Sequence, residues 1–393
     1  MRTKVCFLLN SLSFLDERVF EKEGKSLVKQ GYEVTIIAPK IKGALFDVNG
    51  SPFSNRFQKE VFIHQNITIK TYEYTHKVDP AAAHPLYLTG LKERADIYHA
   101  HELQSFHIGK EIKRTLRTGE NKMTKLLYDS RWVDPDPYSD TPKESIRQRD
   151  MMLLESLKEV DYIISTSESM KAWYLSKYPR IPVEVIYDSP PLVSSYHLKG
   201  RESKTFTAAF TGAPSKENRE MIVSCMRKGR EDIDLRFKVI GGGSQVFVPD
   251  QLSPYITMTD LLPYDSLPKT LADVDTGFIN MDSSRSLHDS FALPSSFFTY
   301  LNNAVPVVVS KCHEMEHFIR TYHCGIVINK QKPKPEDYVD GFLYLYRHKN
   351  KAREMSWNAR KVMEDHFNWS YMEKRLLKVY NSMRGDKPGY LMT

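Results

Sequence analysis

Short apolar runs alternate with amphipathic segments along the whole chain. In the first half, the runs with the length and composition of buried strands are Lys4–Leu9, Glu33–Ala38, Thr68–Tyr72, Ile97–Ala100, Lys125–Tyr128, Tyr162–Ser165 and Val183–Ile186. Helical patterns lie between them, as in Glu17–Lys29, which Gly31 is placed to end with a left-handed cap. Nearly all-apolar strands separated by helices are typical of a parallel sheet covered on both faces.

The alternation breaks between residues 188 and 204, where prolines and serines follow no period, and this segment is interpreted as an interdomain linker. Further strand-like runs follow it at Phe206–Phe210, Leu235–Ile240, Tyr255–Met258, Thr276–Met281, Pro306–Val309 and Gly325–Ile328, and the end is helical from about Glu336 to Met383. The pattern predicts two doubly wound α/β domains, residues 1–190 and 205–368, facing each other across a cleft between the carboxyl ends of their strands. Lys42–Asn66 is irregular and is expected to form a surface loop.

Composition narrows the class of protein. The 393 residues are 41% hydrophobic and 27% charged, as in a globular protein, and the net charge of +7 is spread along the chain. No basic arm supports nucleic-acid binding, although a modest positive charge permits contact with phosphorylated substrates or anionic lipid. No apolar run approaches the roughly 20 residues of a membrane-spanning helix, and charged residues interrupt the signal-like start. A cytoplasmic protein is expected.

No metal site is predicted. Cys6, Cys225, Cys312 and Cys324 form no paired motif, so free thiols are expected. The run Asp134-Pro-Asp136 has the letters of a metal-binding motif, but its prolines indicate a rigid turn and no third ligand is evident.

The second domain contains a segment suited to binding phosphate. Gly212 allows a tight turn after a strand, Ser215 is placed to cap the next helix, and Lys216 and Arg219 lie in its first turn. A helix N-terminus beside two cations suits a diphosphate. An ordinary capped helix with solvated cations accounts equally well for the same residues.

Two further segments of this domain point to the same kind of ligand. Gly241 begins a glycine run after a strand, but its spacing is not that of a dinucleotide-binding loop, and a flexible turn is the better interpretation of that run alone. Farther on, Ser295 and Ser296 are expected at the start of a helix covering Phe297–Asn303, with Arg285 near enough to add charge.

In the first domain, polar residues follow two strands. His101 and Glu102 come at the end of one strand, and Asp129, Arg131 and Trp132 come at the end of the next. Open α/β sheets bind ligands at such strand ends. His101 suits a base, although a histidine at this position is more often a structural hydrogen-bonding group.

Taken in order, several segments resemble the family-four retaining glycosyltransferases, which have the GT-B fold. They are NSLSFLDERVFEKEGKSLVKQGYEVTIIAP, ADIYHAHEL, LLYDSRW, VDYIISTSESM, FKVIGGGS, LLPYDSLPKTLADVDTGFINM, ALPSSFFTYLNNAVPVVVS and FNWSYMEKRLLKVY. The resemblance implies transfer of a sugar from a nucleotide-diphosphate-sugar with retention of configuration, with no bound metal or other cofactor. It also implies that a terminal helix, about residues 369–385, crosses back onto the first domain.

The resemblance assigns roles to particular residues. Lys216 matches the family's phosphate-contacting lysine, and Gly241 matches the glycine before the donor pocket. The family's two donor-binding glutamates fall on Phe291 and Thr299, and its first-domain histidine falls on Arg131. The expected catalytic residues are therefore His101, Glu102 and Arg131. The expected donor-binding residues are Gly212, Lys216, Arg219, Gly241, Arg285, Ser295, Ser296 and Thr299.

Two interpretations accommodate these substitutions. The favoured hypothesis is an active glycosyltransferase with a rebuilt donor site, acting on a cell-envelope glycan or glycolipid. The alternative is a GT-B-shaped accessory subunit that binds or positions a partner; an epimerase acting on the free donor ranks last. A helix face bearing Lys110, Lys113, Arg114 and Arg117 is a candidate for contact with anionic membrane, although solvated helix faces of this kind are common.

Overall fold

The computed structural model describes residues 2–54, 56–76, 81–200, 203–243, 248–260, 262 and 264–385. The chain divides into two units. The first comprises Met1–Asp136, Thr141–Ile186 and Met372–Thr393, and the second comprises Pro137–Asp140 and Tyr187–Tyr371.

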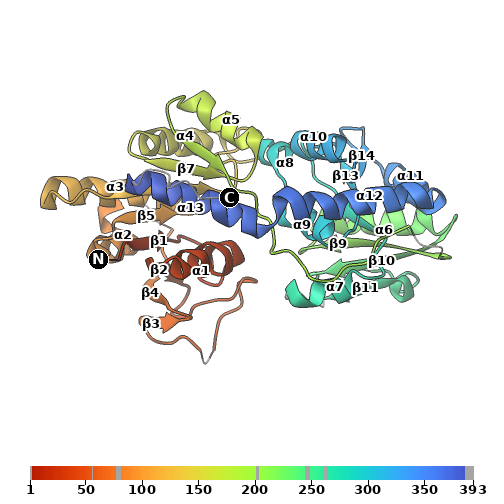
Figure 1. The fold of residues 1–393 in the computed structure, drawn as a ribbon, viewed down its shortest axis with the longest axis horizontal. Coiled ribbons are helices and arrows are strands. Elements are labelled where there is room, and N and C mark those ends of the chain that lie inside the picture. Colours follow the sequence, from red (N-terminus) through yellow and green to blue (C-terminus); the bar gives the residue numbers. More distant parts are fainter. Residues whose placement is uncertain are drawn as a thin grey trace. The chain divides into compact units, whose positions relative to one another are not determined.

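The first unit is built on an eight-stranded sheet with the order β3-β4-β2-β1-β5-β6-β7-β8 (Figure 1). The strands are β1 (Lys4–Leu8), β2 (Glu33–Lys40), β3 (Val61–His64), β4 (Ile67–Glu73), β5 (Ile97–Ala100), β6 (Lys125–Ser130), β7 (Tyr162–Ser165) and β8 (Val183–Val185). All pairs are parallel except β3 with β4. Every predicted strand of this half is present, and β3, within the segment expected to be irregular, is an addition.

Helices cover both faces of this sheet. They are η1 (Glu17–Gly24), α1 (Lys25–Lys29), η2 (Ala81–Ala83), α2 (Pro85–Glu93), α3 (Leu103–Glu120), α4 (Lys143–Leu157), α5 (Glu168–Lys177) and α13 (Trp369–Arg384). Because side chains alternate along β5, Tyr98 joins the core beneath α2 and α3, whereas His99 faces η1 and α13. The predicted helix over 17–29 forms, but its first part is a π-helix.

The terminal helix returns to the first unit as the family resemblance implies. Tyr380 of α13 lies against Tyr32 and hydrogen-bonds His99, and Arg375 donates to the carbonyl oxygen of Val185 at 2.9 Å. Figure 1 shows α13, in blue, lying along this unit.

The second unit has a six-stranded, all-parallel sheet with the order β11-β10-β9-β12-β13-β14. Its strands are β9 (Thr205–Thr211), β10 (Asp234–Ile240), β11 (Ile256–Thr259), β12 (Thr276–Ile279), β13 (Val307–Ser310) and β14 (Gly325–Ile328). Its helical segments are α6 (Lys216–Gly229), η3 (Ser253–Tyr255), η4 (Tyr264–Ser266), α7 (Leu267–Thr270), α8 (Leu287–Phe291), α9 (Ser295–Asn302), α10 (His313–Tyr322), α11 (Pro335–Arg347), α12 (Lys349–Val362) and η5 (Met363–Phe367). Each strand predicted for this half is present.

Both units therefore have the doubly wound α/β architecture that the sequence predicts. The segment after Ile186 is irregular as expected, and it is bound along the second unit, where Val193 accepts a hydrogen bond from Arg360. All four cysteines are buried and unpaired, which confirms the expectation of free thiols. Among the described residues, no helix is both long and apolar enough to cross a bilayer.

Candidate functional site

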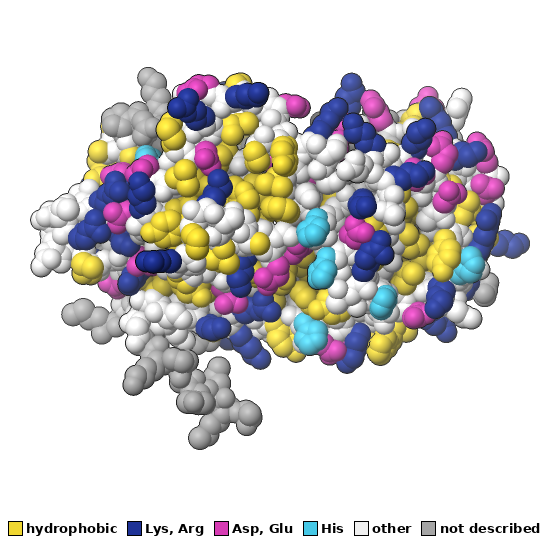
Figure 2. Space-filling model, turned by 90° about the horizontal axis from the view of Figure 1, so that it is seen from above, with side chains coloured by type: hydrophobic (Ala, Val, Ile, Leu, Met, Phe, Trp, Pro, Cys, Tyr) yellow, Lys and Arg dark blue, Asp and Glu magenta, His cyan; other side chains and the backbone are white. Residues whose placement is uncertain are grey.

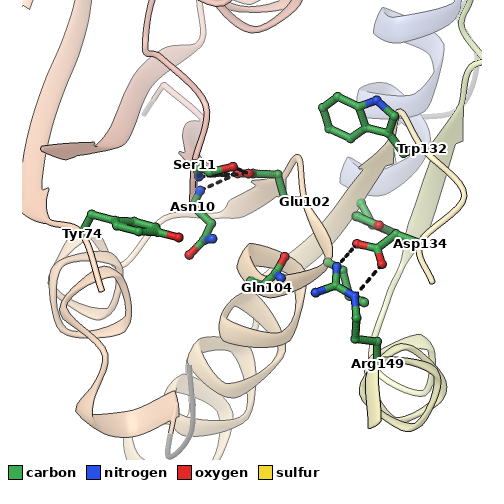
Figure 3. A pocket seen from close by; sticks show the side chains of 10 residues that line it. Asn10, Ser11, Tyr74, Glu102, Gln104, Trp132, Asp134 and Arg149 are labelled. Atoms are coloured by element: carbon green, nitrogen blue, oxygen red, sulfur yellow. Dashed lines mark hydrogen bonds and ion pairs between the residues drawn. The ribbon is translucent and has the colours of Figure 1, made fainter. Parts of the chain in front are cut away.

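A polar pocket of about 280 Å³ opens at the carboxyl edge of the first sheet (Figure 3). It is lined by Asn10, Ser11, Tyr74, Glu102, Leu103, Gln104, Tyr128, Trp132, Asp134 and Arg149. Most of these residues follow or end β1, β4, β5 and β6, so the pocket lies at the strand ends where a ligand site was predicted. Sequence reasoning identified Glu102 and Trp132 among its walls.

Glu102 holds the loop that follows β1. Its carboxylate accepts hydrogen bonds from the backbone N–H groups of Asn10 at 2.5 Å and Ser11 at 2.9 Å, and from the Ser11 hydroxyl. Its own backbone N–H donates to the Ser105 hydroxyl at 3.1 Å, at the start of α3. Glu102 thus lines the pocket, and its oxygens anchor one of the walls; its catalytic role stays a prediction.

Opposite this loop, Asp134 and Arg149 form a two-pronged ion pair. Arg149 Nε donates to Asp134 Oδ1 at 2.8 Å, and a second guanidinium nitrogen contacts Oδ2. The pair makes Asp134 part of a pocket wall. Arg149 was missed because α4 brings it to the pocket, and no local sequence signal marks that contact.

Trp132 provides an aromatic wall, with 41% of its surface exposed. In Figure 3 it lies on the Asp134 side of the pocket, and Tyr74 lies on the other side. Aromatic rings with one exposed face combine apolar contact with tolerance of water, as binding of a sugar ring requires.

Arg131 lies beside the pocket without lining it. Its guanidinium binds Asp16 at 2.8 Å and lies 5.1 Å from the centre of the Trp132 ring. Asp16 also accepts a hydrogen bond from the Val19 N–H and so caps η1. Arg131 therefore ties the end of β6 to the start of the π-helix.

The structure corrects the expected position of His101. This histidine is fully buried in a cluster with Arg18, Glu23, His99 and Asp129, so it has no surface to offer a substrate. His101 follows β5 as predicted, but its side chain lies beneath η1. The expectation that His101 faces the reacting sugar does not fit this burial.

Burial and charge set the ionisation of this cluster. Burial, and then the charge of Asp129, raise the pKa of Glu23 well above its usual range. Burial opposes ionisation of Asp129, but the Arg18 guanidinium outweighs it and holds that pKa well below the usual range. Burial, and then the neighbouring His101, keep the pKa of His99 well below its usual value.

In the second unit, glycines bring two strand ends close together. Gly212 and Gly241 have φ angles of +113° and +97°, and a Cβ on Gly241 would lie 3.3 Å from the Gly212 backbone. The Gly212 N–H donates to the Ile240 carbonyl at 2.7 Å, and the Gly241 N–H donates to Thr259 at 3.0 Å. Both positive φ angles favour glycine, and the one at Gly212 confirms the predicted tight turn.

The helix that follows begins as predicted. Ser215 caps α6 by accepting a hydrogen bond from the Asn218 N–H at 3.2 Å, and Lys216 is exposed in the first turn. Arg219 Nε donates to the Pro214 carbonyl at 3.1 Å, so part of this guanidinium closes the loop. Glu217 has a lowered pKa, caused by hydrogen bonds from its own backbone N–H and Ser215 and by the charges of Lys216 and other cations.

Arg285 and the two serines lie where the sequence placed them along the chain. Arg285 is 70% exposed, lies 3.7 Å from Asp282, and contributes to the lowered pKa of Glu217 in α6. Ser295 and Ser296 are half-buried and form the first residues of α9.

Thr299 differs from the expectation of donor contact. It is 4% exposed, and its hydroxyl donates to the Ser295 carbonyl at 3.0 Å, one turn earlier in α9. The Thr299 hydroxyl, which was expected to contact the donor, is therefore engaged in a hydrogen bond within α9.

Two residues that sequence reasoning missed connect β12 to α6. Asn280 donates from its side-chain amide to Asn218 at 2.8 Å and accepts from the Tyr338 hydroxyl at 2.7 Å. The sequence did not mark them as site residues, because a single asparagine after a strand is common. The contact shows that the β12 end and the first turn of α6 belong to one edge, together with Gly212 and Gly241.

A second cavity, of about 400 Å³, lies beside β10, β11 and α7. It is lined by Lys238, Val239, Ile240, Thr257, Thr259, Lys269 and Thr270. None of the predicted site residues lines it.

The basic residues of α3, considered as a candidate for contact with anionic membrane, are not free cations. They are paired with acids: Lys110 with Glu111, Lys113 with Asp161, and Arg114 and Arg117 with Glu159. On the molecular face drawn in Figure 2, Lys and Arg side chains are likewise interspersed with Asp and Glu side chains. The sequence argument for contact with anionic membrane therefore loses its basis.

The comparisons with known proteins agree with this arrangement. Residues 17–188 match the family model described as Glycosyltransferase Family 4. This segment is therefore similar to the Family 4 glycosyltransferase domain. It contains most of the residues that line the pocket of the first unit. A search of curated protein sequences finds no significant match.

Solved structures match over nearly the whole length. Sucrose-phosphate synthase from Thermosynechococcus elongatus aligns with a TM-score of 0.73 at 14% identity, covering 98% of this chain and 100% of the other. Anabaena HepE in complex with UDP aligns with a TM-score of 0.66 at 10% identity, covering 97% and 100%. TarM aligns with a TM-score of 0.56 at 13% identity, covering 86% of this chain and 66% of TarM. The chain therefore has the GT-B fold, as the resemblance implied.

Proposed function

We propose that this protein is a glycosyltransferase that moves a sugar from a nucleotide-diphosphate-sugar to a glycan or lipid-linked acceptor of the cell envelope. The observation that carries the proposal is the family match over residues 17–188, whose strand ends form the polar pocket. HepE has been solved with UDP and with UDP-glucose, and TarM with UDP and a glycosylated glycerol. These ligands support a nucleotide-sugar donor for this chain.

In this proposal the second unit binds the donor. Lys216 and Arg219 neutralise the diphosphate, and the Gly212 turn together with the α6 N-terminus allows backbone N–H groups to approach it. Ser295 and Ser296 at the start of α9 and the exposed Arg285 complete the set. These cations and hydrogen-bond donors stabilise the departing diphosphate as its negative charge develops. This arrangement suits retaining transfer that needs no metal ion at the reacting centre.

The pocket of the first unit accepts the other substrate. Trp132 offers a ring for one sugar face, and the Asp134–Arg149 pair and Asn10 offer both hydrogen-bond donors and acceptors. This mixture suits hydroxyl groups, which donate and accept. Glu102 keeps the loop carrying Asn10 in place.

A second candidate is a GT-B accessory protein that binds a nucleotide without transferring a sugar. The observation that favours it is the loss of carboxylates at Phe291 and Thr299, with the Thr299 hydroxyl bound inside α9. A charged hydrogen bond is worth about 1.5–3 kcal/mol, so loss of two requires compensation from other contacts.

Calorimetric titration with a panel of nucleoside diphosphates tests donor binding. We expect Lys216→Ala to weaken binding of the preferred nucleotide by about ten- to a hundredfold, because it removes one charged hydrogen bond. The matched control is Arg227→Ala, an exposed cation near the other end of the same helix. Equal binding by both variants would contradict the assigned role of Lys216.

Nucleotide release from sugar donors in the presence of glycan acceptors, followed by mass spectrometry, distinguishes the two candidates. The enzyme releases nucleotide and produces an extended acceptor whose anomeric configuration reports retention. The accessory protein binds nucleotide and produces neither. Absence of nucleotide binding would contradict both.

A further inference from the structure

The buried cluster beneath η1 contains an unusual concentration of polar atoms without partners. Five nitrogen and oxygen atoms from three fully buried side chains make no hydrogen bond: both carboxylate oxygens of Glu23, Nε2 of His99, and both ring nitrogens of His101. Buried polar groups almost always have a partner, and an unpartnered group indicates an enclosed water or ion. Two of the five face a charged neighbour, since Glu23 Oε1 lies 3.2 Å from Arg18 and His101 Nδ1 lies 3.5 Å from Asp129. The other three, Glu23 Oε2 and the Nε2 atoms of His99 and His101, point to an occupant between them.

The spacing of these atoms is that of ligands around one ion. Glu23 Oε2 lies 3.8 Å from His99 Nε2 and 3.7 Å from His101 Nε2. Both distances are too long for a hydrogen bond. Two ligands that each bind one tetrahedral ion at about 2.0–2.2 Å lie about 3.3–3.6 Å apart, so small shifts of these side chains would bring the three atoms to binding distance. His99 and His101 occupy alternate positions at the end of β5, so both rings extend from the same face of the sheet.

The surrounding groups are arranged as supports for metal-binding imidazoles. The Tyr380 hydroxyl lies 2.9 Å from His99 Nδ1, and Asp129 Oδ2 lies 3.5 Å from His101 Nδ1. Metal-binding histidines usually have their second ring nitrogen held by a carboxylate or another oxygen, which fixes the ring and its tautomer. His99 Nδ1 is thus hydrogen-bonded, His101 Nδ1 faces a carboxylate, and the Nε2 atom of each ring is left for an ion.

Arg18 binds Asp129 and so separates that carboxylate from the group formed by Glu23 and the two histidines. It binds both oxygens of Asp129, at 2.6 and 3.1 Å, and compensates the charge of that carboxylate. It lies 3.2 Å from Oε1 of Glu23, which leaves Oε2 facing the two histidines. Two imidazoles and one carboxylate oxygen therefore share a space, while Asp129 stays outside it.

We propose that Glu23, His99 and His101 bind a divalent first-row transition-metal ion, Zn²⁺ being the first candidate. Two imidazole nitrogens select such an ion over Ca²⁺ and Mg²⁺, which prefer a shell of oxygen ligands. Because the three side chains have no exposed surface, the ion is structural: it fastens η1 to β5 beneath α13. The proposal is independent of the sugar-transfer proposal, since it concerns a site that no substrate reaches.

Metal analysis of the purified full-length protein tests the site directly. The protein is produced without a histidine tag in zinc-supplemented medium, and its metal content is measured by plasma mass spectrometry. We expect about one ion per chain, and Co²⁺ substituted during expression should give a visible absorption spectrum with imidazole ligation. Metal below about a tenth of an ion per chain would overturn the proposal and assign the space to water.

Variants locate the ion. Glu23→Gln and His101→Asn should each lower the metal content at least fivefold. His84→Asn changes another buried histidine of the same unit, one that binds the Leu86 N–H, and should keep the ion. Full metal content in both cluster variants would place the ion elsewhere and overturn the assignment.

Loss of folding in the variants does not leave the question open. Wild-type protein produced in zinc-limited medium is titrated with Zn²⁺, and its melting temperature is recorded. We expect a rise that saturates near one equivalent; no rise, together with no bound zinc, would overturn the proposal. None of these measurements depends on nucleotide binding or sugar transfer, so failure of one proposal is distinguishable from failure of the other.

Discussion

The carboxyl edges of the two sheets are built in different ways. The first edge is formed by side chains that hold one another, such as Glu102 on the loop after β1 and Asp134 on Arg149. The second is formed by backbone turns at Gly212 and Gly241, beside the start of α6. A surface of fixed side chains suits recognition of hydroxyl groups, whereas a helix N-terminus suits recognition of phosphate.

The two edges also differ in what lies behind them. Beneath η1, the first edge rests on an ionic cluster that includes Arg18 and Asp129, both fully buried. Behind the second edge, the Tyr300 hydroxyl donates to the Ala209 carbonyl at 2.9 Å, and its ring packs on Gly277. Removal of one partner from a buried charge destabilises a protein strongly, whereas removal of a neutral hydrogen bond costs less stability. Substitutions should therefore affect the first unit more than the second.

The largest effect is expected for Asp129→Asn. This change leaves the Arg18 guanidinium buried without its main partner, and loss of one member of a buried pair costs about 3–5 kcal/mol. Urea unfolding of the full-length protein measures the decrease in the free energy of unfolding. The control is Glu21→Gln, which removes the exposed partner of Lys25 and should cost less than about 1 kcal/mol. Equal losses would mean that the buried cluster contributes no more than a surface pair.

A smaller effect is expected for Glu102→Gln. The amide cannot replace a carboxylate that accepts from two backbone N–H groups and the Ser11 hydroxyl, and charged hydrogen bonds are worth about 1.5–3 kcal/mol. We expect loosening of the loop at Asn10 and Ser11, seen as faster amide hydrogen exchange there, and weaker acceptor binding. Nucleotide affinity should not change. Equal weakening of both ligands would contradict the assignment of this pocket to the acceptor.

The smallest effect on stability is expected for Gly241→Ala, at about 1–3 kcal/mol, because its φ of +97° suits only glycine. The new Cβ would press on the Gly212 backbone, so nucleotide affinity should fall as well. Gly119→Ala is the control, since Gly119 lies in α3 with nothing near its Cβ position, and a gain of about 0.4–1 kcal/mol is expected. Unchanged nucleotide affinity in Gly241→Ala would show that the turn does not form the donor site.

Much of the fold was predictable because it depends on local patterns. Runs of apolar residues marked every parallel strand, and Gly31 and Ser215 marked a helix end and a helix start. The strand β3 was missed because its apolar run, Val61–Ile63, is only three residues long and lies in an otherwise polar, irregular segment. It pairs with β4 at the edge of the sheet, where one side of the strand has no neighbour.

The candidate site was predictable only in part. The sequence placed Glu102, Trp132 and Lys216 near strand ends, and the structure finds them there. The sequence did not indicate Arg149, which lines the pocket. It also predicted that His101 and Thr299 contact a ligand, although both are buried. A strand end fixes where a residue lies along the chain, but the direction of its side chain depends on the pleat and on what packs above.

The sequence alone thus determined the order of the elements, the two α/β domains and the chemistry available at each strand end. These follow from hydrophobic periodicity and turn residues, which act over a few positions. Only the tertiary structure decided which charges are paired and which histidines are enclosed. The Arg18–Asp129 pair joins residues 111 positions apart, and the His99–Tyr380 contact joins residues 281 apart. Such contacts depend on how whole elements pack, because burial, and not spacing along the chain, gives a charge its partner.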